Sequence, residues 1–267
     1  MTKYIWLTLA GMLTALFQVS AQELYVNSEP ASNMAAKSLG IRLENQGYFK
    51  PDYRNRTTLE AMLGINKYIM VHGTAYMSDF YQDKQRFEGV SAYAKYRFYS
   101  ADSVQRHFRM AAFAKASSIR NVQYNQEISL EGDNTGLQGG LVATQLVHKL
   151  AVSGSLSYLR AFENKGGYEP VNRNSIAYAL SAGYLLFPKK YTNYEQTNIN
   201  LYAELLGKSN PGKAQYYIDI APAVQFIFNS VLRVDLSYRT PLTNRMLRNT
   251  QNMYLVRVEY NLFNIFN

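Results

Sequence analysis

Charged side chains recur at alternate positions in several stretches of the chain, where they could select a solute by its charge. The earlier members of the set are all basic, whereas the later ones mix the two signs. Fixed charges along a polar wall are what a narrow pore uses to favour one class of solute over another. The candidate lining residues are Arg42, Lys95, Arg97, Arg109, Lys115, Glu204, Asp219, Arg233, Asp235, Arg239, Arg257 and Glu259.

Met62, Met70 and His72 form a second set that could carry chemistry. If residue 65 pairs with residue 69 in a hairpin, Met62 lies opposite His72 and Met70 shares their face. Two thioethers and an imidazole can hold a soft cation such as Cu(I). Methionine also fills irregular interiors because its side chain adapts its shape. We favour this packing interpretation and expect neither a metal nor another cofactor.

A catalytic arrangement is not visible among the histidines and carboxylates. An integral hydrolase needs a nucleophile beside a base, or Asp and His gathered at one rim. His72 falls in the middle of an alternating stretch on its polar side, His107 at the end of one, and His148 in a turn. The sequence therefore predicts that the protein is not an enzyme.

The elements that would position these residues are clearest in the stretch 57–80. Apolar and polar residues alternate on both sides of 66–68, and a period of two is typical of strands. Keeping both apolar faces on one side places 65 opposite 69 and leaves 66–68 as the turn. Soluble strands commonly have about five or six residues. These strands approach the roughly 9–11 residues that a tilted strand needs to cross a bilayer.

The same period recurs along the chain and predicts about twelve strands. Connections are alternately mostly long and mostly short; 99–105 is one of the short set, and the exceptions are a short outer loop at 81–85 and a longer turn at 188–195. Pro222 predicts a bulge or local unpairing. An even strand number with this alternation is typical of an all-β, transmembrane, antiparallel up-and-down barrel with both termini in the periplasm. The soluble alternative, an eight-stranded barrel with its apolar face inward, fits the strand number less well. The segments lie near 37–46, 57–65, 69–78, 86–98, 106–118, 135–147, 150–162, 173–187, 196–207, 215–228, 231–240 and 252–263.

The N-terminal region predicts export. Residues 1–21 carry one early cation, an apolar run and a small-residue end, the pattern of a cleaved signal peptide. Residues 22–36 contain Pro30 and no sustained period, so we expect an irregular periplasmic lead-in before a barrel domain at 37–267. The sequence has no Cys, which excludes disulfides and thiolate metal sites.

The amino-acid composition and net charge indicate which classes of partner the protein contacts. The net charge is +9, yet no run of five cations suggests nucleic acid, and an anionic lipopolysaccharide surface explains the sign more simply. The 23 Tyr residues suit a belt at the membrane interface, because the ring is apolar and the hydroxyl stays wet. We expect contact with outer-membrane lipid and lipopolysaccharide, and no nucleic acid.

The segments ELYVNSEPASNMAAKSLGIRLEN and AMLGINKYIMVHGTAYMSDF resemble porin-like outer-membrane barrels of Gram-negative bacteria, specifically of the Bacteroidota. The resemblance covers the whole mature chain. It implies an outer-membrane location and insertion by the barrel-insertion machinery. Such barrels commonly end in an aromatic residue, whereas here Phe266 lies one place before the terminus.

Together these features predict a porin-like channel or transporter that passes small polar solutes, anionic ones among them. The alternative is a closed structural or surface-interaction barrel whose lumen charges pair with one another. An integral outer-membrane hydrolase is a third reading, and it lacks a catalytic constellation.

Overall fold

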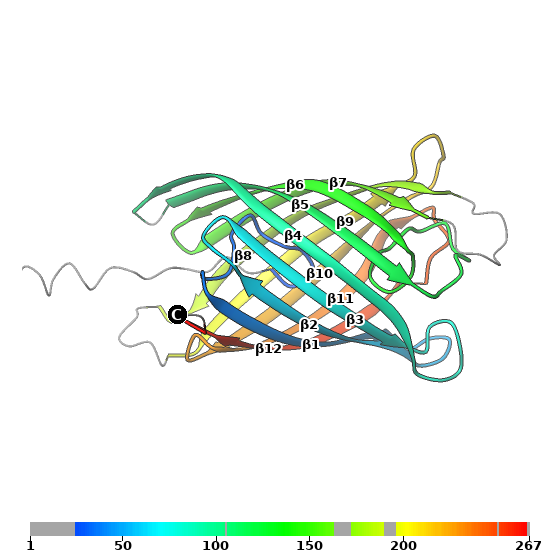
Figure 1. Ribbon diagram of the computed structural model, residues 1–267, viewed down its shortest axis with the longest axis horizontal. Coiled ribbons are helices and arrows are strands. Elements are labelled where there is room, and N and C mark those ends of the chain that lie inside the picture. Colours follow the sequence, from blue (N-terminus) through cyan, green and yellow to red (C-terminus); the bar gives the residue numbers. More distant parts are fainter. Residues whose placement is uncertain (1–24, 105, 163–171, 190–195, 250, 266–267) are drawn as a thin grey trace, which may run out of the picture.

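The computed structural model describes residues 25–104, 106–162, 172–189, 196–249 and 251–265. The signal peptide predicted at 1–21 lies outside these residues. The described chain forms one closed antiparallel sheet in which each strand pairs with its sequence neighbours, and β1 (Ser38–Tyr48) pairs with β12 (Met253–Leu262) to close the barrel. Figure 1 shows this barrel from the side. No helix suited to crossing a membrane occurs in the described part of the chain.

The period-two pattern predicts the strands well. In the first hairpin Met62 pairs with His72 and Gly64 with Met70, so the predicted register is confirmed. The remaining strands are β2 (Arg54–Gly64), β3 (Ile69–Ser78), β4 (Arg86–Ser103), β5 (Arg106–Ile119), β6 (Gly136–Val147), β7 (Leu150–Ala161), β8 (Asn174–Phe187), β9 (Asn198–Ser209), β10 (Tyr216–Phe228) and β11 (Leu232–Asn244). We call the barrel end with the connections after odd-numbered strands the loop end, and the other end the turn end.

One local expectation needs correction and another is confirmed. The turn expected at 99–105 is mostly strand, because a bulge between Arg97 and Tyr99 shifts the register and lets β4 stay paired with β5 as far as Ser103. At Pro222 the strands keep their register: pairing of β10 with β11 is interrupted between Ile220 and Ala223, as expected for a missing donor. The register shift in this pair lies instead between residues 218 and 219.

Side chains alternate between an apolar outside and a mixed inside. On neighbouring positions of β6, Leu141 is 53% exposed and Val142 2%. Exposed tyrosines occur towards both ends of the barrel, for example Tyr96 and Tyr184 near the turn end and Tyr158 near the loop end. Because an apolar band between aromatic girdles is what lipid requires, this surface fits a membrane-spanning barrel.

Leu141→Arg tests which face meets lipid. We expect the free energy of unfolding to fall by about 2–4 kcal/mol, because the guanidinium would lie near the bilayer midplane. Val104→Arg is the control, since Val104 is 93% exposed beyond the membrane-facing wall and should tolerate a charge. Urea unfolding in lipid vesicles measures both variants, and equal stability would contradict the assignment of faces.

Candidate functional site

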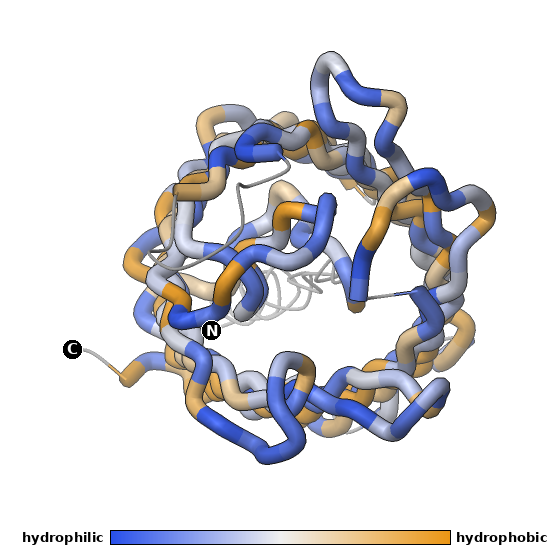
Figure 2. The backbone as a smooth tube through the Cα atoms, turned by 90° about the vertical axis from the view of Figure 1, so that its right-hand side faces the viewer, coloured by the Kyte–Doolittle hydropathy of each residue, from blue (hydrophilic) through white to orange (hydrophobic). Residues whose placement is uncertain are grey.

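The lead-in predicted to be irregular runs inside the barrel from residue 25 to residue 37 (Figure 1, dark blue). Tyr25 and Val26 are buried against Tyr202 and Leu255 of the wall, and Ala31 packs on Val142. Figure 2, viewed along the barrel from the loop end, shows chain segments lying inside the ring of strands. The lumen is therefore occupied by the protein's own chain at its turn end.

Glu204 on β9 is the first anchor of the lead-in. One carboxylate oxygen accepts hydrogen bonds from the backbone N–H groups of Val26 (3.1 Å) and Asn27 (2.7 Å), and from the Asn27 amide (3.1 Å). The other oxygen accepts from the hydroxyls of Ser28 (2.7 Å) and Ser181 (3.1 Å). A buried carboxylate needs such donors, so Glu204 and the lead-in stabilise each other.

Lys95 on β4 is the second anchor, on the facing side of the lumen. Its ammonium is 1% exposed, donates to the carbonyls of Pro30 (2.7 Å) and Ser32 (2.9 Å), and lies 3.4 Å from the Glu29 carboxylate. Burial alone would raise the pKa of Glu29, but Lys95, His72 and Arg42 lower it, and the net direction is downward. Glu29 is thus held as a carboxylate.

A second segment, the connection 120–135 between β5 and β6, crosses the loop end of the lumen. Glu127 accepts hydrogen bonds from Lys208 (2.9 Å) and Tyr217 (2.7 Å) on one side of the barrel. On the opposite side Asp133 pairs with Arg56 at 2.8 Å. We call this segment the crossing loop, because it is fixed to both walls.

Glu127 makes the docking of the crossing loop pH-dependent. Burial would raise its pKa, but the charges of Lys208 and Arg239 and hydrogen bonds lower it to about 2. A carboxyl group stabilises the folded state when its pKa is lower in the folded protein than in the unfolded chain. This stabilisation is complete at a pH above the unfolded pKa and is lost as the pH falls through the folded pKa.

We therefore expect the crossing loop to loosen as pH falls from about 4.5 towards 2. Limited digestion with pepsin should cleave at 120–135 faster at the lower pH. Glu127→Gln removes this carboxyl and keeps Glu131 and Asp133 of the same loop, so the pH dependence of its cleavage, relative to a barrel-wide reference, should be clearly smaller than in the wild-type protein. A wild-type dependence that survives in Glu127→Gln would contradict the assignment to this group.

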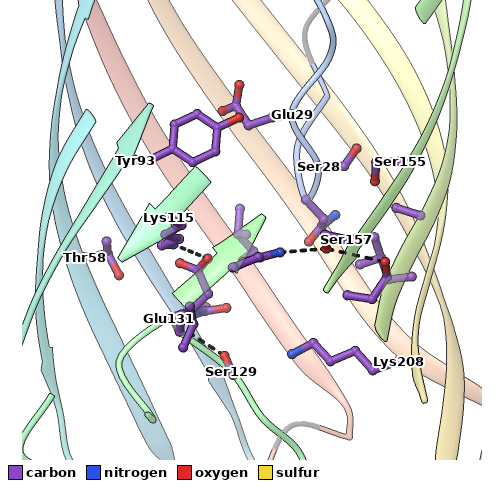
Figure 3. A pocket seen from close by; sticks show the side chains of 18 of the residues that line it. Ser28, Glu29, Thr58, Tyr93, Lys115, Ser129, Glu131, Ser155, Ser157 and Lys208 are labelled. Atoms are coloured by element: carbon purple, nitrogen blue, oxygen red, sulfur yellow. Dashed lines mark hydrogen bonds and ion pairs between the residues drawn. The ribbon is translucent and has the colours of Figure 1, made fainter. Parts of the chain in front are cut away.

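Between the lead-in and the crossing loop lies a polar cavity of about 330 Å³, which we call the chamber. Figure 3 shows Ser28 and Glu29 of the lead-in on one side of it and Ser129 and Glu131 of the crossing loop on the other. The volume lies at the lower end of the roughly 300–1,000 Å³ of small-molecule sites.

The chamber carries no net formal charge. It is lined by six acidic residues, Glu29, Glu44, Glu60, Glu127, Glu131 and Asp133, and six basic ones, Arg42, Arg56, Lys115, Lys208, Arg239 and Arg257. Most form ion pairs, such as Arg257 with Glu44 at 2.5 Å and Lys115 with Glu131. A wall of paired charges orients polar groups without favouring one sign of solute.

The predicted lining residues all occupy inward positions, but they are engaged with protein groups. Arg42 lies within 3.6 Å of Glu29, Glu60 and Glu259, and Asp219 binds both Arg239 and Arg248. The predicted basic stripe is not left free for a solute, because Lys95 and Arg109 hold the lead-in. The other predicted residues join this lattice: Arg97, Lys115, Glu204, Arg233, Asp235, Arg257 and Glu259.

Glu60, Glu127 and Lys208 belong to this lattice but are not among the predicted lining residues. Glu60 could have been found, because it alternates with Met62 on the inward face and the strand register places it opposite Arg42. Glu127 and Lys208 are 81 residues apart, and no local pattern joins them.

Met62, Met70 and His72 come together as the hairpin register predicts. Both methionines are buried beside a small cavity of about 30 Å³ that Met34 of the lead-in also lines. The His72 ring lies against Tyr93, and its Nδ1 is 3.5 Å from Glu60. No described group of three or more His, Asp or Glu residues is arranged to hold a metal ion. That the cluster serves packing and binds no metal stays a prediction.

Comparisons with known proteins connect this geometry to a fold. No protein-family model and no curated protein matches the chain. A solved structure of the KdgM porin in complex with disordered oligogalacturonate aligns with a TM-score of 0.51 and 14% identity, over 84% of this chain and 98% of that one. The CymD monoaromatic hydrocarbon channel aligns with a TM-score of 0.40 and 10% identity, over 92% and 93%.

At such low identity the KdgM alignment speaks for the fold alone. It agrees with the closed barrel described above. The described residues form a closed barrel of twelve antiparallel strands whose fold is similar to that of the KdgM porin.

Proposed function

We propose that the protein is an outer-membrane channel for small polar solutes, and that its lead-in is the gate. The observation that carries the proposal is the chamber, a polar cavity enclosed between two segments that are not part of the wall. Both segments are held by side-chain anchors, so either could move while the barrel stays intact. With the long connections outside the cell, the lead-in would close the periplasmic side.

The charge balance of the chamber supports uncharged or zwitterionic solutes. Six acidic and six basic residues cancel, so nothing in the lining favours the anionic solutes that the basic stripe suggested.

Current recordings across a KCl gradient test this proposal. We expect openings with a reversal potential near zero, because paired charges favour neither K⁺ nor Cl⁻. Lys115→Gln should shift the selectivity towards K⁺, since it leaves Glu131 without its lysine partner. Strong anion selectivity in the wild-type protein would contradict a neutral chamber.

The second candidate is a closed barrel with a structural or surface-interaction role. The observation in its favour is that Lys95 and Arg109 hold the lead-in instead of facing an open lumen. This reading predicts no discrete conductance even after the lead-in is loosened. That the protein is not an enzyme also stays a prediction.

A further inference from the structure

The wall of the lumen binds the main chain of the lead-in at six points, in addition to contacts with its side chains. Three backbone N–H groups donate to wall side chains: those of Val26 and Asn27 to Glu204, and that of Ala31 to Thr144 at 2.8 Å. Three backbone carbonyls accept from cations: that of Tyr25 from Arg233 at 3.1 Å, and those of residues 30 and 32 from Lys95. These groups occur in every peptide, whatever its side chains.

Glu204 is a wall residue whose surroundings suit the binding of a peptide segment. It is fully buried, and among the described residues it forms no ion pair. Its charge is offset by N–H and O–H donors, four of which belong to the lead-in. A buried carboxylate without a cation is costly unless such donors are present. Glu204 therefore requires an occupant of the lumen that presents several donors together.

The lead-in itself leaves groups beside the chamber unsatisfied. His72 Nε2 and the Tyr93 hydroxyl are buried and have no hydrogen-bond partner, although both residues line the chamber. Their rings contact each other with centroids 4.9 Å apart. An unpartnered buried polar atom costs about 1–3 kcal/mol, so the fit of the lead-in is incomplete at this point. Another occupant could supply the missing partners.

We propose that this wall is a binding site for short peptides, in which the lead-in is a resident peptide. The site is formed by Glu204, Lys95, Arg233 and Thr144, which read the main chain, and it opens onto the electroneutral chamber. That peptides also pass through the barrel rests on the proposed channel function. That they bind at this site does not. Recognition of main-chain groups gives affinity without strict sequence selectivity, as in peptide sites that pair with an extended backbone.

The test uses the full-length protein with Asn27→Pro and Ala31→Pro. Each proline removes one of the main-chain donors, Asn27→Pro also removes the side-chain amide that donates to Glu204 and Ser237, and every wall residue stays unchanged. Ala36→Pro is the matched control, because Ala36 is exposed and its N–H takes part in no described hydrogen bond. Protease digestion reports whether the lead-in is released, and heat-modified gel mobility reports whether the barrel is folded.

The probe is a fluorescent synthetic peptide with the sequence YVNSEPAS, added to each variant in detergent. We expect it to bind the double-proline variant about tenfold more tightly than the Ala36→Pro control, whose lead-in still fills the site. A scrambled peptide should bind more weakly than this sequence but still measurably, because it keeps the main-chain groups and loses the Asn27 and Ser28 side-chain donors to Glu204. Methylation of the amide nitrogens corresponding to residues 26, 27 and 31, or Glu204→Gln in the protein, should weaken binding about tenfold or more.

Released lead-in without peptide binding would overturn the proposal, as would a lead-in that stays protected despite both prolines. Equal binding of an uncharged oligosaccharide would also overturn it, because the site would not then read a peptide main chain. Ion current without peptide binding would leave the channel standing and remove the peptide site. Peptide binding without ion current would leave the peptide site standing and remove the channel function.

Discussion

Lys95→Met combined with Glu204→Gln should convert a mostly closed barrel into one that conducts in discrete steps. The two side chains hold opposite sides of the lead-in, and together they make seven of its described hydrogen bonds. A hydrogen bond to a charged group contributes about 1.5–3 kcal/mol, so losing both anchors should weaken docking by about 3 kcal/mol or more. Because each 1.4 kcal/mol is a factor of ten, the open fraction should rise about 100-fold.

Planar-bilayer recording of the full-length variant measures this change directly. The matched control is Arg54→Met with Asp83→Asn, which neutralises an ion pair of 2.6 Å at the loop end, away from the lead-in. The control should keep the wild-type open fraction. A silent Lys95→Met, Glu204→Gln variant whose lead-in is cut by protease would favour the closed structural barrel instead.

The barrel could be predicted from the sequence because its strands obey a local rule. Each strand exposes one face to lipid and one to the lumen, so alternation alone marks its position and its inward residues. Cross-strand partners follow from the register: Arg42 pairs with Glu60 on one side and Glu259 on the other, as neighbours on the inner face. The predicted number of twelve strands also follows from this alternation of outward and inward residues.

The occupied lumen could not be predicted in the same way. The lead-in has no period, and its anchor Glu204 lies 178 residues from Val26 in the sequence. Nothing in the order of residues 25–37 indicates which wall groups they meet. The same holds for the crossing loop, whose residue Glu127 finds its cation on β9. Long-range pairing of irregular segments depends on the closed barrel already being present, so a local pattern does not contain it.

Arg56→Met should be the most destabilising single change at the loop end. The Arg56 guanidinium is 1% exposed and lies 2.8 Å from both Glu88 and Asp133. It also donates to the Glu131 carbonyl and stacks over Phe80 at 4.7 Å. Glu88 is fully buried, so removing the cation leaves an uncompensated charge in the wall. Breaking such a pair costs about 3–5 kcal/mol.

Urea unfolding of the reconstituted protein measures this loss, and protease cleavage within the crossing loop should increase in parallel, because Asp133 loses its anchor. Arg54→Met is the control two residues away: its partner Asp83 has a side chain 92% exposed, so the expected loss of stability is small. Adding Glu88→Gln and Asp133→Asn to Arg56→Met should restore part of the stability, since the unpaired charges are then gone. If Arg56→Met and Arg54→Met destabilise the barrel equally, the buried ion pairs do not hold the crossing loop in place.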